Sequence, residues 1–203
     1  SDERLFDRQN APSWYDHLFG KLNAPFDAFT DNRLTVITFN YDRSLEWYLY
    51  IVLSNAYNLD REVSLKALKS IPIVHVHGQL GPLSYGDEPG RTYNYEPSKA
   101  REAASGIKVV HAGAEDDEQF QTARRYLYEA KKVYFIGFGY HAANVKRLRI
   151  DEIPSHTVIY GSVYGMTDAE AQQAKTRFNG RLHTGRGDWD ALAFLRNFEP
   201  LDD

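Results

Sequence analysis

The chain has 203 residues, of which 42% are hydrophobic and 26% are charged, so it can form one domain with a substantial core. Its formal net charge of −4 gives no electrostatic reason to expect a polyanion, and nucleic acid is therefore not an expected partner. The absence of cysteine excludes disulfides, thiolate nucleophiles and cysteine-bound zinc, and it fits a reducing, cytoplasmic location. No stretch approaches the roughly 20 apolar residues of a membrane span, so no membrane association is expected.

The first 33 residues predict a helical N-terminal segment. Apolar and aromatic side chains stand at helical spacing from Trp14 to Leu22, and Pro25 breaks the pattern. The sequence begins at Ser1 without the layout of a secretory signal, and its single methionine is Met166. We therefore expect a fragment of a longer protein.

Residues 34–203 predict one α/β domain, in which short apolar runs alternate with helical stripes. Such alternation is typical of a Rossmann-like parallel sheet with flanking helices. The main strands are predicted at residues 34–37, 71–74, 133–136 and 157–160. Helical stripes are predicted over residues 45–56, 120–130, 142–149, 170–178 and 189–198, with Thr167 and Glu170 as a capping box and Asp188 as the cap of the last helix.

Residues 79–106 lack any periodicity and predict an irregular insert. Glycine and proline punctuate the stretch, and long loops in compact domains are usually functional or mobile. A short strand is predicted directly afterwards, at residues 108–110.

Three of the predicted strands end at polar or glycine-rich tips. The tips are Thr38–Asp42, His75–Gly78 and Gly137–Tyr140. Because ligands bind beyond the carboxyl ends of parallel strands, we expect the three tips to gather around one crevice that binds a nucleotide.

The first tip places Asn40 and Asp42 between a strand and a helix. Free backbone N–H groups and the helix dipole favour anions at such a junction. The alternative is that both residues are turn formers or helix caps, which is the commoner use of isolated Asn and Asp after a strand.

The second tip contains His75 and His77, which would face the same side of an extended strand. A neutral imidazole can accept a proton from a hydroxyl group or a water molecule near pH 7. The alternative is a pair of histidines held by structural hydrogen bonds. A metal site would need a third ligand, for which His111, His141 and Asp42 are the candidates, and the spacing gives it no further support.

The third tip fits Gly-x-Gly-x-x-Ala from Gly137 to Ala142, the dinucleotide fingerprint of redox enzymes. However, the next predicted strand ends at Tyr160-Gly161-Ser162, with no acidic residue to hold a ribose. This difference argues against an oxidoreductase. Glycines here permit a close backbone approach to a phosphate or ribose, or alternatively tight packing of strand against helix.

Taken in order, these segments resemble the sirtuin-like family, in its divergent branch often found in bacterial proteins. Thr38-Phe39-Asn40-Tyr41-Asp42 resembles the family's T-x-N-x-D element, and His77-Gly78 its catalytic His-Gly pair. Ile136–Tyr140 is similar to the stretch that meets the phosphates or ribose. Gly161-Ser162 and Gly187-Asp188-Trp189 fall where the family closes over adenosine, so the resemblance spans roughly residues 34–198.

The resemblance implies NAD as substrate, with cleavage of its nicotinamide–ribose bond. Asn40 would position a water molecule or the nicotinamide ribose, and His77 would be the general base. Asp42 would recognise the nicotinamide amide. The remaining cofactor-binding positions implied are Thr38, Gly78, Gly137, Gly139, Tyr140, Gly161, Ser162, Asp188 and Trp189.

Two departures from the family shape what we expect. Protein-deacylating sirtuins usually carry a four-cysteine zinc module, and this chain has no cysteine, so water is the expected acceptor and NAD hydrolysis the expected reaction. Relatives of this kind often serve as NAD-consuming effectors in bacterial defence. The family's opening G-A-G segment is absent, so we expect the first nucleotide-binding strand to be missing and the chain alone to have weak or no activity.

Two further functions stay open from the sequence. One is a module that senses NAD or ADP-ribose without turning it over, and the other is a scaffold or oligomerisation domain with a decayed site. A homo-oligomer or additional fused domains are also open.

Overall fold

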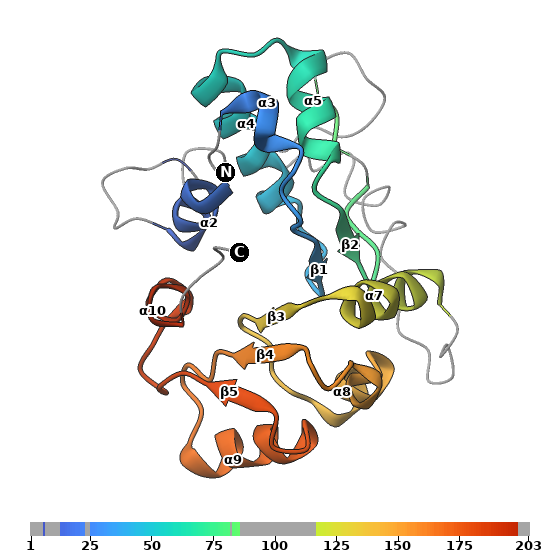
Figure 1. Cartoon of the computed structure of the whole chain (residues 1–203), viewed down its shortest axis with the longest axis vertical. Helices are drawn as coiled ribbons and strands as arrows, with labels where there is room; N and C mark the ends of the chain where they lie inside the picture. The colour runs from blue at the N-terminus through green and yellow to red at the C-terminus, as the bar shows by residue number, and fades with distance from the viewer. Residues whose placement is uncertain (1–5, 7–12, 23–24, 82, 86–116, 199–203) are drawn as a thin grey trace. The chain divides into compact units, whose positions relative to one another are not determined.

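The computed structural model describes residue 6 and residues 13–22, 25–81, 83–85 and 117–198 (Figure 1). The chain divides into two compact units, residues 1–114 and 115–203, and each is described by itself. Parallel strands with flanking helices occur in both units, so the predicted Rossmann-like α/β class is confirmed. Most of the predicted insert and the predicted strand at 108–110 lie outside the described residues.

The first unit is built on two parallel strands, β1 (Val36–Thr38) and β2 (Ile73–His75). Val36 lies opposite Ile73, and Thr38 lies opposite His75. β1 and β2 each end one residue later than predicted, since the predicted strands end at residues 37 and 74. Because paired parallel strands end at the same edge, the two polar tips leave the sheet side by side.

Two helices connect these strands, α4 (Ser44–Tyr57) and α5 (Arg61–Lys69) (Figure 1). They contact each other, and the Ser54 hydroxyl donates a hydrogen bond to Ser64 Oγ at 2.9 Å. The predicted stripe over 45–56 corresponds to α4. α5 was not predicted, although Asp60 caps it by accepting the Val63 N–H at 2.9 Å.

The N-terminal helices α2 (Trp14–Leu22) and α3 (Phe26–Phe29) belong to the same unit. α2 contacts α4, where the Tyr48 hydroxyl donates a hydrogen bond to Asp16 Oδ1 at 2.7 Å. Pro25 directly precedes α3, as expected of a residue that breaks a helix.

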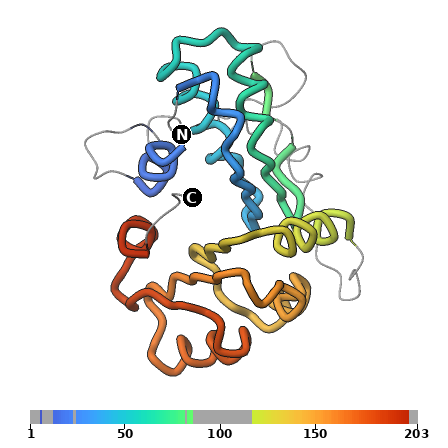
Figure 2. Tube along the Cα trace, viewed as in Figure 1, coloured from blue at the N-terminus to red at the C-terminus, as the bar shows by residue number. Residues whose placement is uncertain are grey.

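The second unit is built on three parallel strands in the order β3-β4-β5 (Figure 1), and its backbone runs from yellow to red in Figure 2. β5 was not predicted. Each strand is followed by a helix or helical turn, as in a Rossmann-like unit. The elements of this unit are α7 (Glu118–Glu129), β3 (Lys132–Phe135), α8 (Ala142–Arg147), the 3-10 helix η2 (Ile150–Glu152), β4 (Val158–Gly161), α9 (Asp168–Arg177), β5 (Leu182–Thr184) and α10 (Ala191–Asn197).

Side chains along β3 and β4 alternate between a buried face and a partly exposed face of the sheet. The Phe178 ring, at the end of α9, packs edge-on against the Phe135 ring at a centroid distance of 5.1 Å. On the opposite face, Tyr134 and Tyr160 stack across β3 and β4 at 5.0 Å. The buried apolar side chains of the three strands are Val133, Phe135, Ile159 and Leu182.

The helix caps of the second unit were predicted in part. The capping box is confirmed, because the Thr167 N–H donates to Glu170 Oε2 and the Glu170 N–H donates to Thr167 Oγ1. The prediction that Asp188 caps the last helix is wrong. α10 begins at Ala191, and Asp190 caps it by accepting the Ala193 N–H at 2.7 Å. None of the described helices is long and apolar enough to cross a membrane.

Candidate functional site

The tips that follow β1 and β2 are joined by backbone hydrogen bonds. The Val76 N–H donates to Thr38 O at 3.0 Å, and the Leu80 N–H donates to Tyr41 O at 3.0 Å. These bonds continue the strand pairing past the ends of both strands. The T-x-N-x-D segment and the His-Gly pair therefore lie at one carboxyl edge of the first unit.

Asn40 and Asp42 are both exposed at this edge. The Asn40 N–H donates to Thr38 Oγ1 at 3.0 Å, which uses the Thr38 hydroxyl inside the segment. Asp42 Oδ1 accepts the Ser44 N–H at 3.0 Å, at the first residue of α4. Asp42 therefore forms a turn just before Arg43, the N-cap of α4, which is the turn-forming alternative for this residue.

His77 and Gly78 lie in a turn beyond β2. Gly78 has a φ of +79° and donates its N–H to His75 O at 3.1 Å. This left-handed conformation favours glycine, which explains the residue type at this position. The half-buried His77 ring lies 5.3 Å from the Phe39 ring and 6.4 Å from the Tyr41 ring, measured between centroids. His77 is thereby flanked by the two aromatic residues that alternate with Thr38, Asn40 and Asp42.

His75 does not share the environment of His77, because β2 ends at His75 and the chain then turns. The expectation that both imidazoles face one side of an extended strand is therefore wrong. His75 is buried, and its Nδ1 lies 2.9 Å from Asn40 O while its Nε2 lies 2.6 Å from Glu46 Oε1.

Burial lowers the pKa of His75, but the hydrogen bond and the negative charge of Glu46 outweigh it. The Asn40 carbonyl and the charge of Asp42 add smaller contributions in the same direction. The net result is a pKa raised above its ordinary value. Sequence reasoning missed Glu46, whose only signal was an acidic residue in the first turn of a helix.

The predicted residues of the second unit gather after the carboxyl ends of its three strands. Gly137 is exposed with a φ of +62°, and its N–H donates to Ser162 Oγ at 2.8 Å. Gly139 is also exposed, and a side chain there would crowd the His141 ring. The exposed backbone from Gly137 to Gly139 is the part of this edge that a ligand can approach.

Tyr140, Gly161 and Ser162 are instead buried. Tyr140 has a φ of +51° and donates its hydroxyl to Ser162 O at 3.0 Å. Burial raises the pKa of Tyr140 far above its ordinary value, so the phenol stays neutral. The packing alternative therefore describes Gly161, and the side chain of Tyr140, which is 1% exposed, is not available to border a phosphate.

Asp188 and Trp189 lie in the loop between β5 and α10. The exposed Asp188 accepts two hydrogen bonds from Arg186, each at 3.0 Å. The Trp189 ring lies 5.9 Å from the Phe198 ring. The Gly165 N–H donates to Gly187 O at 2.9 Å, which ties the loop after β4 to the loop after β5.

The structure thus forms two groups of predicted site residues, one in each unit. Thr38, Asn40, Asp42, His77 and Gly78 share the edge of β1 and β2. Gly137, Gly139, Tyr140, Gly161, Ser162, Asp188 and Trp189 follow the three strands of the second unit. A single crevice formed by all of them stays a prediction.

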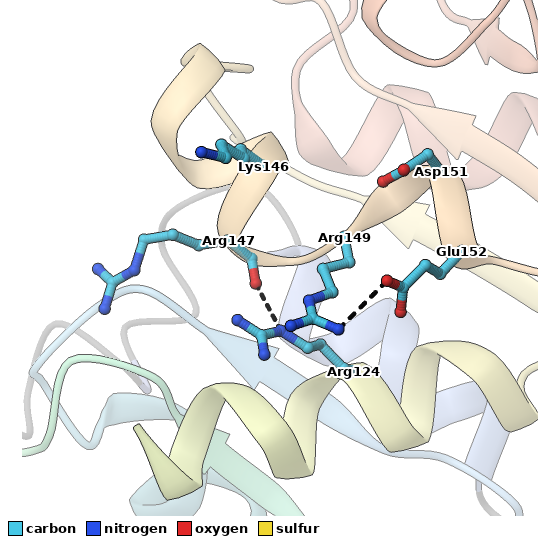
Figure 3. Close-up of a pocket in the computed structure, with 6 residues that line it drawn as sticks. All are labelled: Arg124, Lys146, Arg147, Arg149, Asp151 and Glu152. Atoms are coloured by element: carbon cyan, nitrogen blue, oxygen red, sulfur yellow. Dashed lines mark hydrogen bonds and ion pairs between the residues drawn. The ribbon is translucent and has the colours of Figure 1, made fainter. Parts of the chain in front are cut away.

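A surface pocket that the sequence analysis did not predict lies on α7, α8 and η2 (Figure 3). The Arg124 Nε–H donates to Arg147 O at 2.8 Å, and Arg149 pairs with Glu152 at 3.2 Å. The Arg147 guanidinium lies over the Phe120 ring at 3.9 Å. The pocket is lined by Arg124, Lys146, Arg147, Arg149, Asp151 and Glu152.

The histidines of the second tip were also candidates for a metal site, and of the possible third ligands His111 lies outside the described residues. Within the part of the chain that the structure describes, no three His, Asp or Glu side chains form a group that could hold a metal ion. Comparisons of the chain with protein-family models, with curated proteins and with solved structures return no match.

Proposed function

We propose that this chain is a sirtuin-like, NAD-binding domain and that the full-length natural protein hydrolyses NAD at the nicotinamide–ribose bond. The observation that carries the proposal is the meeting of two motifs at one edge. The T-x-N-x-D segment and the His-Gly pair are joined by the hydrogen bond from the Val76 N–H to Thr38 O, and His77 lies against Phe39. An edge formed by the carboxyl ends of parallel strands is where α/β proteins bind nucleotides.

The proposed reaction begins with departure of nicotinamide as a neutral base. The C1′–N bond breaks, its electron pair stays with nicotinamide, and an oxocarbenium-like ribose remains. A water molecule positioned by Asn40 attacks C1′, and His77 accepts the proton that the water loses. The products are nicotinamide, ADP-ribose and one proton. The exposure of Asn40 and the half-exposed ring of His77 support these roles, since both side chains can reach a ligand.

The second unit has exposed glycine backbone after its first strand, β3. The exposed Gly137 and Gly139 permit backbone approach to a phosphate or ribose. Water is the proposed acceptor because the chain has no cysteine for the zinc module of protein-deacylating sirtuins. A role as an NAD-consuming effector in bacterial defence follows from the resemblance.

The test is release of nicotinamide from NAD by the full-length natural protein, followed by liquid chromatography. His77→Ala is expected to lower turnover about 100-fold or more, the usual contribution of a general base. Asn40→Ala is expected to lower it as well. His156→Ala and Asn55→Ala are the matched controls, because both residues are exposed and lie away from these edges. Unchanged turnover in both His77→Ala and Asn40→Ala would exclude the assigned roles.

A second candidate is a module that binds NAD or ADP-ribose without cleaving it. This candidate is favoured because two side chains of the proposed site already accept hydrogen bonds within the protein. Asp42 accepts the Ser44 N–H, and Ser162 Oγ accepts the Gly137 N–H. In that case NAD and ADP-ribose would both raise the melting temperature while no nicotinamide appears. If neither nucleotide changes the melting temperature at millimolar concentration, a scaffold role is favoured instead.

A further inference from the structure

The buried imidazole of His75 links three segments of the first unit. It lies at the end of β2, contacts the carbonyl of Asn40 in the segment after β1, and contacts Glu46 in the first turn of α4. Only 7% of the His75 side chain and 14% of the Glu46 side chain are exposed, so solvent screens this contact little.

The two contacts determine where the ring carries its protons. A carbonyl oxygen only accepts hydrogen bonds, so Nδ1, 2.9 Å from Asn40 O, must carry a hydrogen. Nε2 lies 2.6 Å from Glu46 Oε1, a separation that requires a proton between them. Nδ1 therefore donates to Asn40 O, and Nε2 shares one proton with Glu46 Oε1. The charged groups that act on His75 are Glu46 from α4 and Asp42 from the segment after β1.

These contacts restrain the backbone on both sides of the Asn40 Cα atom. The preceding peptide is held where the Asn40 N–H donates to Thr38 Oγ1, and the following peptide is held where His75 donates to Asn40 O. When both peptide planes at a Cα atom are fixed, the direction of its Cα–Cβ bond is fixed too. The direction in which the exposed Asn40 side chain leaves the backbone therefore depends on His75.

We infer that His75, held by Glu46, is a positioning residue that orients the Asn40 side chain at the proposed NAD site. The inference rests on the proposed function for the reaction that Asn40 serves. The orientation itself can be measured without NAD. Sequence motifs would not assign this role, because neither His75 nor Glu46 belongs to the segments that carry the resemblance.

Two conservative variants separate the two contacts of the ring. The side-chain amide of His75→Asn reaches the place of Nδ1 and keeps a donor toward Asn40 O. The side-chain amide of His75→Gln reaches the place of Nε2 and keeps only the contact with Glu46. Both variants replace the imidazole by a neutral amide, so they differ mainly in which contact survives. His156→Gln is the matched control on an exposed histidine.

The first measurement is NAD turnover by the full-length natural protein. His75→Gln is expected to lower kcat about 10-fold to 100-fold with KM nearly unchanged, since small misplacements of a positioning group have effects of this size. His75→Asn is expected to stay within about threefold of the natural protein, because the Asn40 contact survives. Equal losses in the two variants, or no loss in either, would overturn the inference.

The second measurement is by NMR on the same proteins without nucleotide. The side-chain amide of Asn40 is expected to keep its chemical shift and order parameter in His75→Asn and to lose order in His75→Gln. In Glu46→Gln the His75 ring is expected to lose its second proton at a lower pH than in the natural protein. An Asn40 amide that is indifferent to both His75 variants would overturn the inference. If this NMR pattern appears while no NAD is cleaved, the proposed function fails and the positioning of Asn40 by His75 stands.

Discussion

A side chain at Gly161 would collide with the hydroxyl of Tyr140. Tyr140 is 1% exposed, and its hydroxyl donates to Ser162 O at 3.0 Å. Gly161 ends β4, the central strand of its sheet, and is paired with Phe135 on one side and Thr184 on the other. The two flanking strands fix Gly161, and the hydrogen bond to Ser162 O holds the Tyr140 hydroxyl, so a side chain at position 161 requires a shift of Tyr140.

We expect Gly161→Ala to lower the free energy of unfolding by about 1–3 kcal/mol, the usual cost of overpacking. Urea denaturation followed by circular dichroism measures the change. Adding Tyr140→Phe removes the hydroxyl oxygen and should reduce the penalty of the alanine.

Gly20→Ala is the matched control for this substitution. Gly20 lies in α2, and a Cβ there meets nothing within 4 Å. The same chemical change should therefore stabilise by up to about 1 kcal/mol, the difference in helix propensity. If the two alanines have equal effects, the predicted clash with Tyr140 is wrong.

The capping box of α9 gives a second prediction. Thr167→Ala removes the acceptor of the Glu170 N–H and should lower the free energy of unfolding by about 1 kcal/mol. Thr167→Ser keeps the hydroxyl and is expected to recover most of the loss. Urea denaturation at pH 7 compares the three proteins, and equal stabilities would contradict a stabilising cap.

The cap should also depend on pH. Hydrogen bonds from the Thr167 backbone and then its hydroxyl lower the pKa of Glu170. A lowered pKa means that the stabilisation is present above the ordinary value near 4.5 and is lost as the pH falls through the folded value. The stability difference between the natural protein and Glu170→Gln should therefore shrink as the pH falls below about 4.5. A difference that is constant with pH would contradict this.

The α/β class was predictable because β1 to β4 are nearly continuous apolar runs, which buried parallel strands require. β5 was not, because in Leu182-His183-Thr184 only Leu182 is apolar. That strand exists because β4 offers it a pairing edge, which is a tertiary effect absent from the local pattern. Asp188 and Asp190 were equally plausible caps by residue type. In the structure Asp190 accepts the Ala193 N–H, whereas Asp188 accepts hydrogen bonds from Arg186.

The candidate site was also predictable only in part. Adjacent parallel strands bring Asn40 and His77 to one edge, and this follows from strand order alone. The contact between His75 and Glu46 joins residues 29 positions apart. It depends on how α4 packs beside β2, which no spacing rule gives. The burial of Tyr140 was missed for the same reason, since a tyrosine beside two glycines has the same sequence signal whether it packs inward or faces a ligand.

The pair of His75 and Glu46 gives a prediction about stability and pH. The pKa of His75 is raised in the folded protein, so its stabilisation is complete below about 6.5 and is lost as the pH rises through the folded value. Glu46→Gln should cost about 2 kcal/mol near pH 6, typical of a hydrogen bond to a charged group. The cost should shrink above the raised pKa of His75. Melting temperatures between pH 5.5 and 9 measure this.

Glu152→Gln is the control for this experiment. Glu152 pairs with Arg149 at an exposed site and contacts no histidine among the bonds described. Removing the Glu152 carboxylate should change the free energy of unfolding by less than about 1 kcal/mol. This change should show no step between pH 6 and 8. A step of similar size in both variants would show that the pH dependence does not come from His75.

The last prediction separates the two roles of Asp42. Its carboxylate accepts the Ser44 N–H at the start of α4, and in the proposed function it also recognises the nicotinamide amide. Asp42→Asn keeps an oxygen that can accept the Ser44 N–H but removes the negative charge. Asp42→Ala removes both. We therefore expect Asp42→Ala to lower the free energy of unfolding by about 1 kcal/mol and Asp42→Asn to leave it nearly unchanged.

Turnover of NAD should follow a different order. Asp60→Ala is the matched control, because Asp60 caps α5 through the Val63 N–H and has no proposed contact with NAD. It should cost as much stability as Asp42→Ala, about 1 kcal/mol, without slowing nicotinamide release below the melting range. Asp42→Asn should slow nicotinamide release although its stability is nearly unchanged. The new side chain is uncharged, and its N–H donors can face the nicotinamide amide where the carboxylate offered only acceptors. If Asp42→Asn and Asp60→Ala both release nicotinamide at the natural rate, Asp42 serves only the turn that precedes α4.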